Sequence, residues 1–488
     1  MRKSQIFEAL YKQNSIDKMI CLTEIKTEED KKEANEDNYI IPYTASEWEQ
    51  TYPSIPVKNI YYTQSYLYAA DPFYIDIDHY IMFHTHLYGT EFLNPTNKNF
   101  ETIMHEIINA KMTAYKEKNY LDLLQSELSE SNGNLVLYLL NLMLEKEPPS
   151  DNLYQVFVDV YSYVDNGTPI LSEETWYDLL QCKSEKQKEK TRKALEKYPD
   201  EIIVYRGEGS QSTPHEKAFS WTTNKQVAYF FATKNGAEKA RLITGKIKKD
   251  DILETISDRD EDEIIIKSEF VKIMDVHNFV TLDNFFRCLQ KEMSNYVTCC
   301  DMSLLQINVL IQKIKILYEY HHDSENDDHT MDHTIRVMMY ANYLFRKIIL
   351  PKYEKTNKQK KMQIMSYFFD LMDAAIYHDI GRTNDFIDEN HGKESYKIYK
   401  KEKKENSIVK FLIEQHCIND GISLEILKKE FHEEQDIIGL LYKILKDADA
   451  LDRTRFGRCE DGLNIDYLRF DESRDIVPIA HAMLEYKL

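Results

Sequence analysis

The order of apolar and polar positions divides this chain into a helical part, a β-rich middle and a second helical part. Between residues 101 and 197 the apolar side chains recur at the spacing of amphipathic helices. The pattern then changes to short runs rich in β-branched residues, which predict strands at 201–205, 219–223, 242–247 and 264–266. From about residue 303 helical spacing returns. A mixed α/β region followed by an all-helical region predicts separate domains.

The predicted fold class is therefore multidomain α+β. At roughly 150 residues per domain, a chain of 488 residues accommodates about three domains. We expect a mixed α/β domain at residues 131–285 and an all-α domain at residues 296–488. Residues 1–130 receive no assignment, although the aromatic-rich segment 60–92 indicates strands or a mixed region.

Charge and cysteine content narrow the possible function. The chain has 62 basic and 83 acidic residues and a net charge of −21, which opposes a broad electrostatic footprint for nucleic acid. The seven cysteines are scattered and form no CxxC pair, which favours a reducing compartment. No run of signal-peptide or membrane-span length is present. We expect a cytoplasmic protein without membrane contact.

Residue types that bind metals gather in the C-terminal part. His378-Asp379 ends an apolar helical pattern, and a charged pair at the end of a buried helix needs compensation, which a metal ion can supply. Imidazole and carboxylate suit divalent transition metals, and a pair of such metals can clamp both oxygens of a phosphate-ester hydrolysis. The candidate ligands are His333, His378, Asp379, His391, His416 and Asp449.

These residues, in this order, resemble the HD superfamily of metal-dependent phosphohydrolases. The resemblance implies that residues 296–488 form an HD domain in which His333, His378, Asp379 and Asp449 bind one metal. His391 and His416 match the additional histidines of the two-metal subset. Asp449 is preferred over Asp447 and Asp452 because the family's Ala-Asp-x-Leu pattern falls on it.

The implied cofactor is a pair of divalent transition ions (Mn, Fe, Ni or Zn). The implied partner is a nucleotide or phosphate-ester substrate, attacked by a water that the metals activate. Arg382 and Lys393 are further candidates, as phosphate contacts.

A second set of candidate residues lies in the β-rich middle. Arg206 ends a predicted strand, and an arginine fork there can bind a pyrophosphate. Ser220 and Thr222 share one face of a short strand because side chains alternate along it. Glu261 and Glu263 share a face by the same rule, and paired carboxylates suit glycosyl-transfer chemistry.

The ordered set resembles the arginine-serine-glutamate class of mono-ADP-ribosyltransferases, which would make residues 131–285 an ADP-ribosyltransferase-like domain. The resemblance implies NAD as cofactor, bound through Arg206, Ser220, Thr222 and Glu263. Glu263 would stabilise the transition state and Glu261 would orient the acceptor of ADP-ribose, which is a protein, a nucleic acid or a small molecule. The segment Trp221-Thr222-Thr223 departs from the smaller residues that are frequent in the family.

The leading hypothesis is a bifunctional enzyme with both chemistries, in a toxin, effector or antiviral defence factor by analogy of architecture. One alternative makes the HD domain the sole enzyme, with the upstream domain as a nucleotide sensor. Another is a non-catalytic scaffold that binds nucleotides through both domains. The oligomeric state is left open.

Overall fold

The structure is a computed structural model of the chain. The residues that it describes are 19–37, 39–63, 72–76, 81–84, 98–124, 133–161, 171–210, 212–234, 239–256, 262–291, 307–321, 330–382, 389–457 and 462–485. The chain forms two compact units. The N-terminal unit comprises residues 1–202, 216–223 and 246–272, and the C-terminal unit comprises residues 203–215, 224–245 and 273–488.

A four-stranded antiparallel sheet opens the N-terminal unit. Its strands lie in the order β1 (Met19–Cys21), β2 (Ile60–Thr63), β3 (Pro72–Asp76) and β4 (Ile81–His84). Ile20 pairs with Tyr62 and Ile60 pairs with Tyr74, and all four side chains are buried. They share a core with Trp48 and other side chains of helices α2 (Glu28–Glu36), α3 (Ala45–Thr51) and α4 (Phe100–Lys116).

A second core of the N-terminal unit joins helices to two of three neighbouring strands. The helices that continue this unit are α5 (Tyr120–Leu124), α6 (Gly133–Leu144), α7 (Asp151–Tyr161), α8 (Glu173–Gln181) and α9 (Glu185–Leu195). The strands β6 (Ser220–Thr222), β9 (Glu263–Ile266) and β8 (Ile252–Ile256) are antiparallel neighbours in that order. Ile256 and Ile265 bury their side chains among the leucines of α6 to α8.

The C-terminal unit contains most of three strands and one helix from the β-rich middle. The strands lie in the order β10 (Lys272–Asn278), β7 (Arg241–Lys248) and β5 (Glu201–Glu208), and the helix is α10 (Lys225–Lys234). Ala228 and Ala232 of α10 belong to the same apolar core as the C-terminal helices. A side chain at Gly207 would place its Cβ 1.8 Å from the carbonyl oxygen of Ala228, so glycine lets β5 approach α10 closely.

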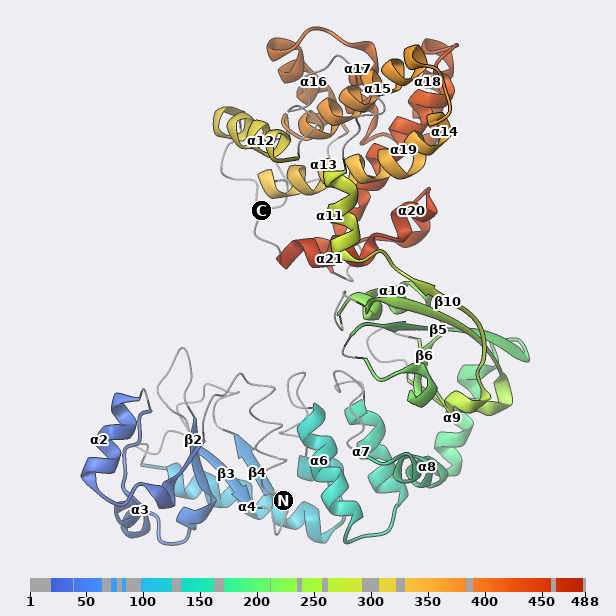
Figure 1. The fold of residues 1–488 in the computed structure, drawn as a ribbon. Coiled ribbons are helices and arrows are strands. Elements are labelled where there is room, and N and C mark those ends of the chain that lie inside the picture. The colour runs from blue at the N-terminus through green and yellow to red at the C-terminus, as the bar shows by residue number, and fades with distance from the viewer. Residues whose placement is uncertain are drawn as a thin grey trace. The chain divides into compact units, whose positions relative to one another are not determined.

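The remainder of the C-terminal unit is helical (Figure 1). The helices are α11 (Leu282–Gln290), α12 (Ile307–His321), α13 (Met331–Leu344), α14 (Leu350–Tyr353), α15 (Lys358–Tyr377), α16 (His391–Glu402), α17 (Ser407–Gln415), α18 (Asp420–Glu430), α19 (Gln435–Asp452), α20 (Asp471–Arg474) and α21 (Val477–Glu485). A π-helical turn at Phe345–Ile349 joins α13 to α14.

Helix α13 lies at the centre of this helical part. It contacts α15 and α19, and every side chain from His333 to Leu344 is buried. Helix α19 repeats apolar residues at helical spacing and turns Ile438, Leu441 and Leu445 into the same core. Helices α15 and α17 also contact each other and α19, so the helices that carry the candidate ligands belong to one apolar core.

Two glycines bring the ends of α15, α16 and α17 within backbone contact. A Cβ at Gly381 would lie 2.4 Å from the backbone nitrogen of Ser395, and a Cβ at Gly392 would lie 2.6 Å from the carbonyl oxygen of Ile413. The Gly381 N–H also donates to the Ser395 hydroxyl at 3.0 Å. We infer that these positions are glycine because larger side chains would separate the helices.

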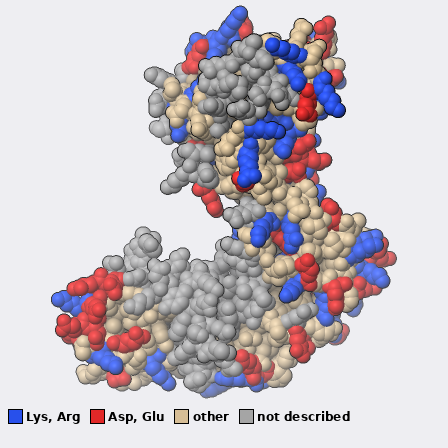
Figure 2. Space-filling view, viewed as in Figure 1, with Lys and Arg blue, Asp and Glu red and all other residues tan. Residues whose placement is uncertain are grey.

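The predicted fold class is confirmed: a mixed α/β region is followed by an all-helical region. The boundaries at residues 130, 285 and 296 stay predictions. None of the helices in the described part of the chain combines the length and hydropathy that a membrane span needs. Basic and acidic side chains are interspersed on the face drawn in Figure 2.

Candidate functional site

Four of the predicted ligands meet where the end of α15 faces α13 and α19. The Nε2 atoms of His333 and His378 lie 3.1 Å apart. The Asp379 Oδ2 atom is 3.5 Å from Nε2 of His333 and 3.7 Å from Nε2 of His378. The Asp449 Oδ1 atom faces the same two nitrogens at 3.5 and 3.8 Å. Two imidazoles and two carboxylates therefore surround one position, called here the first position.

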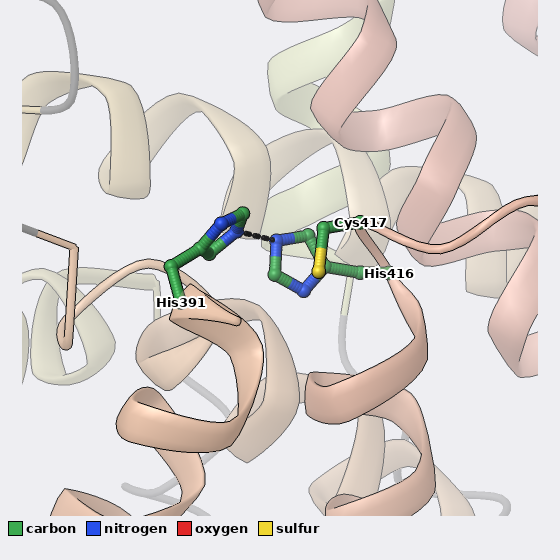
Figure 3. Close-up of side chains that lie close together, drawn as sticks. All are labelled: His391, His416 and Cys417. Atoms are coloured by element: carbon green, nitrogen blue, oxygen red, sulfur yellow. Dashed lines mark hydrogen bonds between the residues drawn. The ribbon is translucent and has the colours of Figure 1, made fainter. Parts of the chain in front are cut away.

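The other oxygen of Asp379 faces a second pair of histidines. Asp379 Oδ1 lies 3.1 Å from Nε2 of His391 and 3.1 Å from Nε2 of His416. These two nitrogens are 2.9 Å apart (Figure 3). Cys417 joins the pair, with its sulfur and one ring nitrogen of each histidine within 4.8 Å of one another. We call this group the second position.

Hydrogen bonds on the far side of three rings fix where their protons lie. Nδ1 of His378 faces the Ala375 carbonyl oxygen at 2.9 Å, and Nδ1 of His416 faces that of Ile413 at 2.6 Å. Nδ1 of His333 faces Asp452 Oδ2 at 2.8 Å. An N–H at each Nδ1 must donate to these acceptors, so in the neutral form of each ring Nε2 presents a lone pair.

Lone pairs and carboxylate oxygens thus face one another in a buried space. The side chains of His333 and His378 are fully buried, and that of Asp379 is 2% exposed. Electron-rich atoms at such separations repel unless a positive charge lies among them. The donor set therefore fits divalent cations, with Asp379 giving one oxygen to each position.

Three aspartates of α19 have different partners. Asp449 faces the histidines, and one third of its side chain is exposed. Asp452 is fully buried and holds the ring of His333 and the guanidinium of Arg336. Asp447 accepts from the backbone N–H and the guanidinium of Arg469. The sequence-based choice of Asp449 remains a prediction, and this geometry is consistent with it.

The charges around His333 shift its protonation strongly. Desolvation lowers the pKa of His333, but the Asp379 and Asp452 carboxylates more than offset this and raise it to about 9. Burial lowers the pKa of His416 in spite of Asp379. For Asp452, burial acts to raise the pKa, but the hydrogen bonds from His333 and Arg336 lower it to about 2. Without a cation, a proton on His333 supplies the positive charge that the acceptors need.

Four further residues bear on this site: two predicted phosphate contacts, and two residues whose part in the site the sequence did not indicate. Arg382, three residues after Asp379, is half-buried, and Lys393 is exposed in the first turn of α16. Their role as phosphate contacts stays a prediction. The support that Asp452 gives to His333 was missed. Cys417 was also missed as a site residue, although it directly follows His416 in the sequence.

The middle set is partly brought together in the N-terminal unit. Thr222 pairs with Glu263 across β6 and β9, and the Ser220 hydroxyl donates to the Glu263 carboxylate. The Thr222 hydroxyl lies 3.4 Å from the carbonyl oxygen of Asp262. Glu261 lies outside the described residues.

Arg206 belongs to the C-terminal unit, and its side chain contacts other residues of that unit. Its guanidinium donates to the Thr213 carbonyl oxygen at 2.7 Å and lies 3.4 Å from the buried carboxylate of Glu208. Glu208 also binds Arg241 at 2.6 Å. A nearby cavity of about 460 Å³ is lined by Glu208, Gly209, Ser210, Ser212, Pro214, Lys239, Ala240, Arg241, Asn278, Phe279 and Thr281.

Comparison with known proteins agrees with the C-terminal site. Residues 330–454 match the family model described as the HD domain, which covers less than half of the chain. The matched segment runs from the start of α13 to just past α19 and includes all six predicted metal ligands. No curated protein and no solved structure matches the chain. The comparisons do not support the ADP-ribosyltransferase assignment.

We predict that Asp449→Asn and Asp447→Asn impair different properties of the protein, the first its cation affinity and the second its stability. Asp449→Asn should weaken cation binding at least about tenfold, since it removes a ligand that faces two imidazoles. Asp447→Asn should destabilise the fold by about 2–4 kcal/mol because it breaks a buried pair with Arg469. Metal titration and thermal unfolding of the metal-free proteins measure the two effects. The reverse pattern would show that Asp447 is the ligand.

We also predict that cation binding displaces a proton. The pKa of His333 is about 9 without metal, so the ring is protonated at neutral pH and must lose its proton to bind a cation. Between pH 7 and pH 9 the apparent affinity of metal-stripped protein should therefore rise by about tenfold per pH unit. Calorimetry in buffers of different ionisation enthalpy counts the released protons. An affinity that is independent of pH over this range would contradict the prediction.

Proposed function

We propose that the C-terminal part of the chain is a metal-dependent phosphohydrolase that acts on a nucleotide or another phosphate ester. The observation that carries the proposal is the carboxylate of Asp379, whose two oxygens face two separate histidine pairs. This arrangement suits two adjacent cations. The family match over residues 330–454 supports the same reaction class.

The proposed ligands divide between the two positions. His333, His378 and Asp449 would hold the first cation, His391 and His416 the second, and Asp379 both. When bound, a pair of divalent cations polarises a phosphate group and activates water for attack on phosphorus. Manganese, iron, nickel and zinc are all compatible with nitrogen and oxygen ligands.

The chain's own groups prepare the site for an anionic substrate. Asp452 orients His333 through Nδ1, and backbone carbonyls orient His378 and His416 in the same way. Asp379 and Asp449 carry less negative charge than two divalent cations carry positive charge, so a loaded site attracts phosphate. Since Asp449 is the most exposed of these carboxylates, we place the approach of substrate on its side.

The hydrolase proposal predicts the effect of Asp379→Asn. This substitution removes charge from both positions and should lower phosphohydrolase activity by at least about a thousandfold. Asp436→Asn is the matched control, because Asp436 is exposed in the first turn of α19 and should leave activity unchanged. The assay uses dialysed protein with Mn, Fe, Ni or Zn and a panel of nucleotides and phosphate esters.

Two results would refute the hydrolase proposal. One is equal activity of Asp379→Asn and Asp436→Asn. The other is the absence of all four metals in the purified protein, together with no activity after any of them is added. The second result, combined with nucleotide binding, would favour the non-catalytic scaffold.

A second candidate function is NAD-dependent ADP-ribosyl transfer. The observation that favours it is the hydrogen bond from Ser220 to Glu263 on the adjacent strands β6 and β9. A glutamate held by a serine hydroxyl is suited to stabilise the positive charge that develops on ribose when the nicotinamide bond breaks. The alternative is a nucleotide sensor without turnover, which leaves hydrolysis as the only reaction.

Measuring NAD turnover distinguishes the transferase from the nucleotide sensor. If the transferase proposal is right, incubation with NAD and cell lysate labels an acceptor, and Glu263→Gln abolishes the labelling. Glu269→Gln, at an exposed position of the same unit, should leave it intact. Mass spectrometry of the products provides the measurement. Labelling that survives Glu263→Gln excludes the assigned role, and absence of labelling by the wild-type protein favours the sensor.

A further inference from the structure

We propose that Cys417 is a sulfur ligand of the second position and makes that position selective for a thiophilic metal. The proposal rests on the two-cation function above and concerns which metal each position accepts. Its basis is the compact group of His391, His416 and Cys417, whose ligand atoms all lie within 4.8 Å of one another (Figure 3).

The local fold brings the sulfur to the two imidazoles. His416 is the residue at which α17 ends, and Cys417 follows it, while His391 begins α16. Gly392 lets the start of α16 approach the carbonyl oxygen of Ile413, where a Cβ would lie at 2.6 Å. The sulfur is half-buried and faces the Glu389 carbonyl oxygen at 3.5 Å. The group is therefore placed by the same packing that places the histidines.

The two positions then differ in their donor atoms. The first position has two imidazole nitrogens and two carboxylate oxygens, from His333, His378, Asp379 and Asp449. The second has two imidazole nitrogens, the remaining oxygen of Asp379 and the sulfur of Cys417. Thiolate favours zinc and iron over manganese and magnesium, whereas nitrogen and oxygen ligands discriminate less. The second position should thus bind zinc or ferrous iron while the first remains permissive.

Other described cysteines lack this setting. In the part of the chain that the structure describes, Cys417 is the cysteine that shares a potential metal-binding group with histidines. Cys288 is also half-buried, but it lies on α11, away from such a group. It therefore provides a matched control for the loss of a thiol.

Cobalt provides a test that does not depend on catalysis. The full-length protein is stripped of metal with a chelator and titrated with Co(II), and its absorption spectrum is recorded. Coordination by Cys417 releases the thiol proton to solvent and should produce a sulfur-to-cobalt charge-transfer band in the near ultraviolet. We expect this band in the wild-type protein and in Cys288→Ser, and its loss in Cys417→Ser with the weaker visible cobalt bands retained.

Metal selectivity and alkylation give independent readouts. Cys417→Ser should weaken zinc binding at the second position by at least about tenfold, with manganese affinity changed much less. If that variant fails to fold, the wild-type protein alone still tests whether Cys417 is a ligand. Bound zinc should protect Cys417, but not Cys288, from alkylation detected by mass spectrometry. Any of three results overturns the proposal. The charge-transfer band is missing in the wild-type protein, the band persists in Cys417→Ser, or zinc does not change the alkylation of Cys417.

The charge-transfer band and the phosphohydrolase activity test the sulfur-ligand proposal and the hydrolase proposal separately. A charge-transfer band in a protein without phosphohydrolase activity would support the sulfur ligand and refute the reaction. Activity that depends on Asp379, in a protein without the band, would support the reaction and refute the sulfur ligand.

Discussion

The carboxylate of Asp379 presents one oxygen to each of two histidine pairs, and the rest of the site is arranged around it. Such a group, 2% exposed and surrounded by imidazole lone pairs, is costly to bury unless positive charge accompanies it. The protein meets this requirement without metal by raising the pKa of His333 to about 9, so that a proton remains there. A divalent cation can replace this proton. Burial of the Asp379 carboxylate thus requires either a proton or a cation in the site.

Apolar packing, rather than the charged residues, sets the geometry. The buried side chains of α13 and the apolar face of α19 fix His333 and Asp449. Backbone contacts at Gly381 and Gly392 fix the ends of α15, α16 and α17, where Asp379, His391 and His416 lie. The ligands come from distant stretches of sequence but meet because each stands at the end or along the buried face of a helix in one core. This rigidity is what a two-cation site requires.

Periodicity and residue type predicted much of this arrangement. The helical spacing after residue 303 identified the helices that carry the ligands, and the order of histidines and aspartates indicated the metal site. The Ala-Asp-x-Leu pattern singled out Asp449 among the three aspartates of α19, but no pattern indicated that Asp452 supports His333 or that Asp447 binds Arg469, because only packing determines those contacts. Cys417 was overlooked because a single cysteine has no spacing pattern. The close approach of Gly381 to Ser395 was not indicated either, because it depends on how α15 packs against α16.

The β-rich middle shows the limit of reasoning from short motifs. Ser220 and Glu263 meet because β6 and β9 are paired, but Arg206 binds the Thr213 carbonyl oxygen beside the buried Glu208, and no motif indicated either contact. Anomalous diffraction from crystals of the metal-loaded protein would locate the bound cations. We expect two peaks, one on each side of the Asp379 carboxylate. A single peak, or none within bonding distance of Asp379, would contradict this expectation.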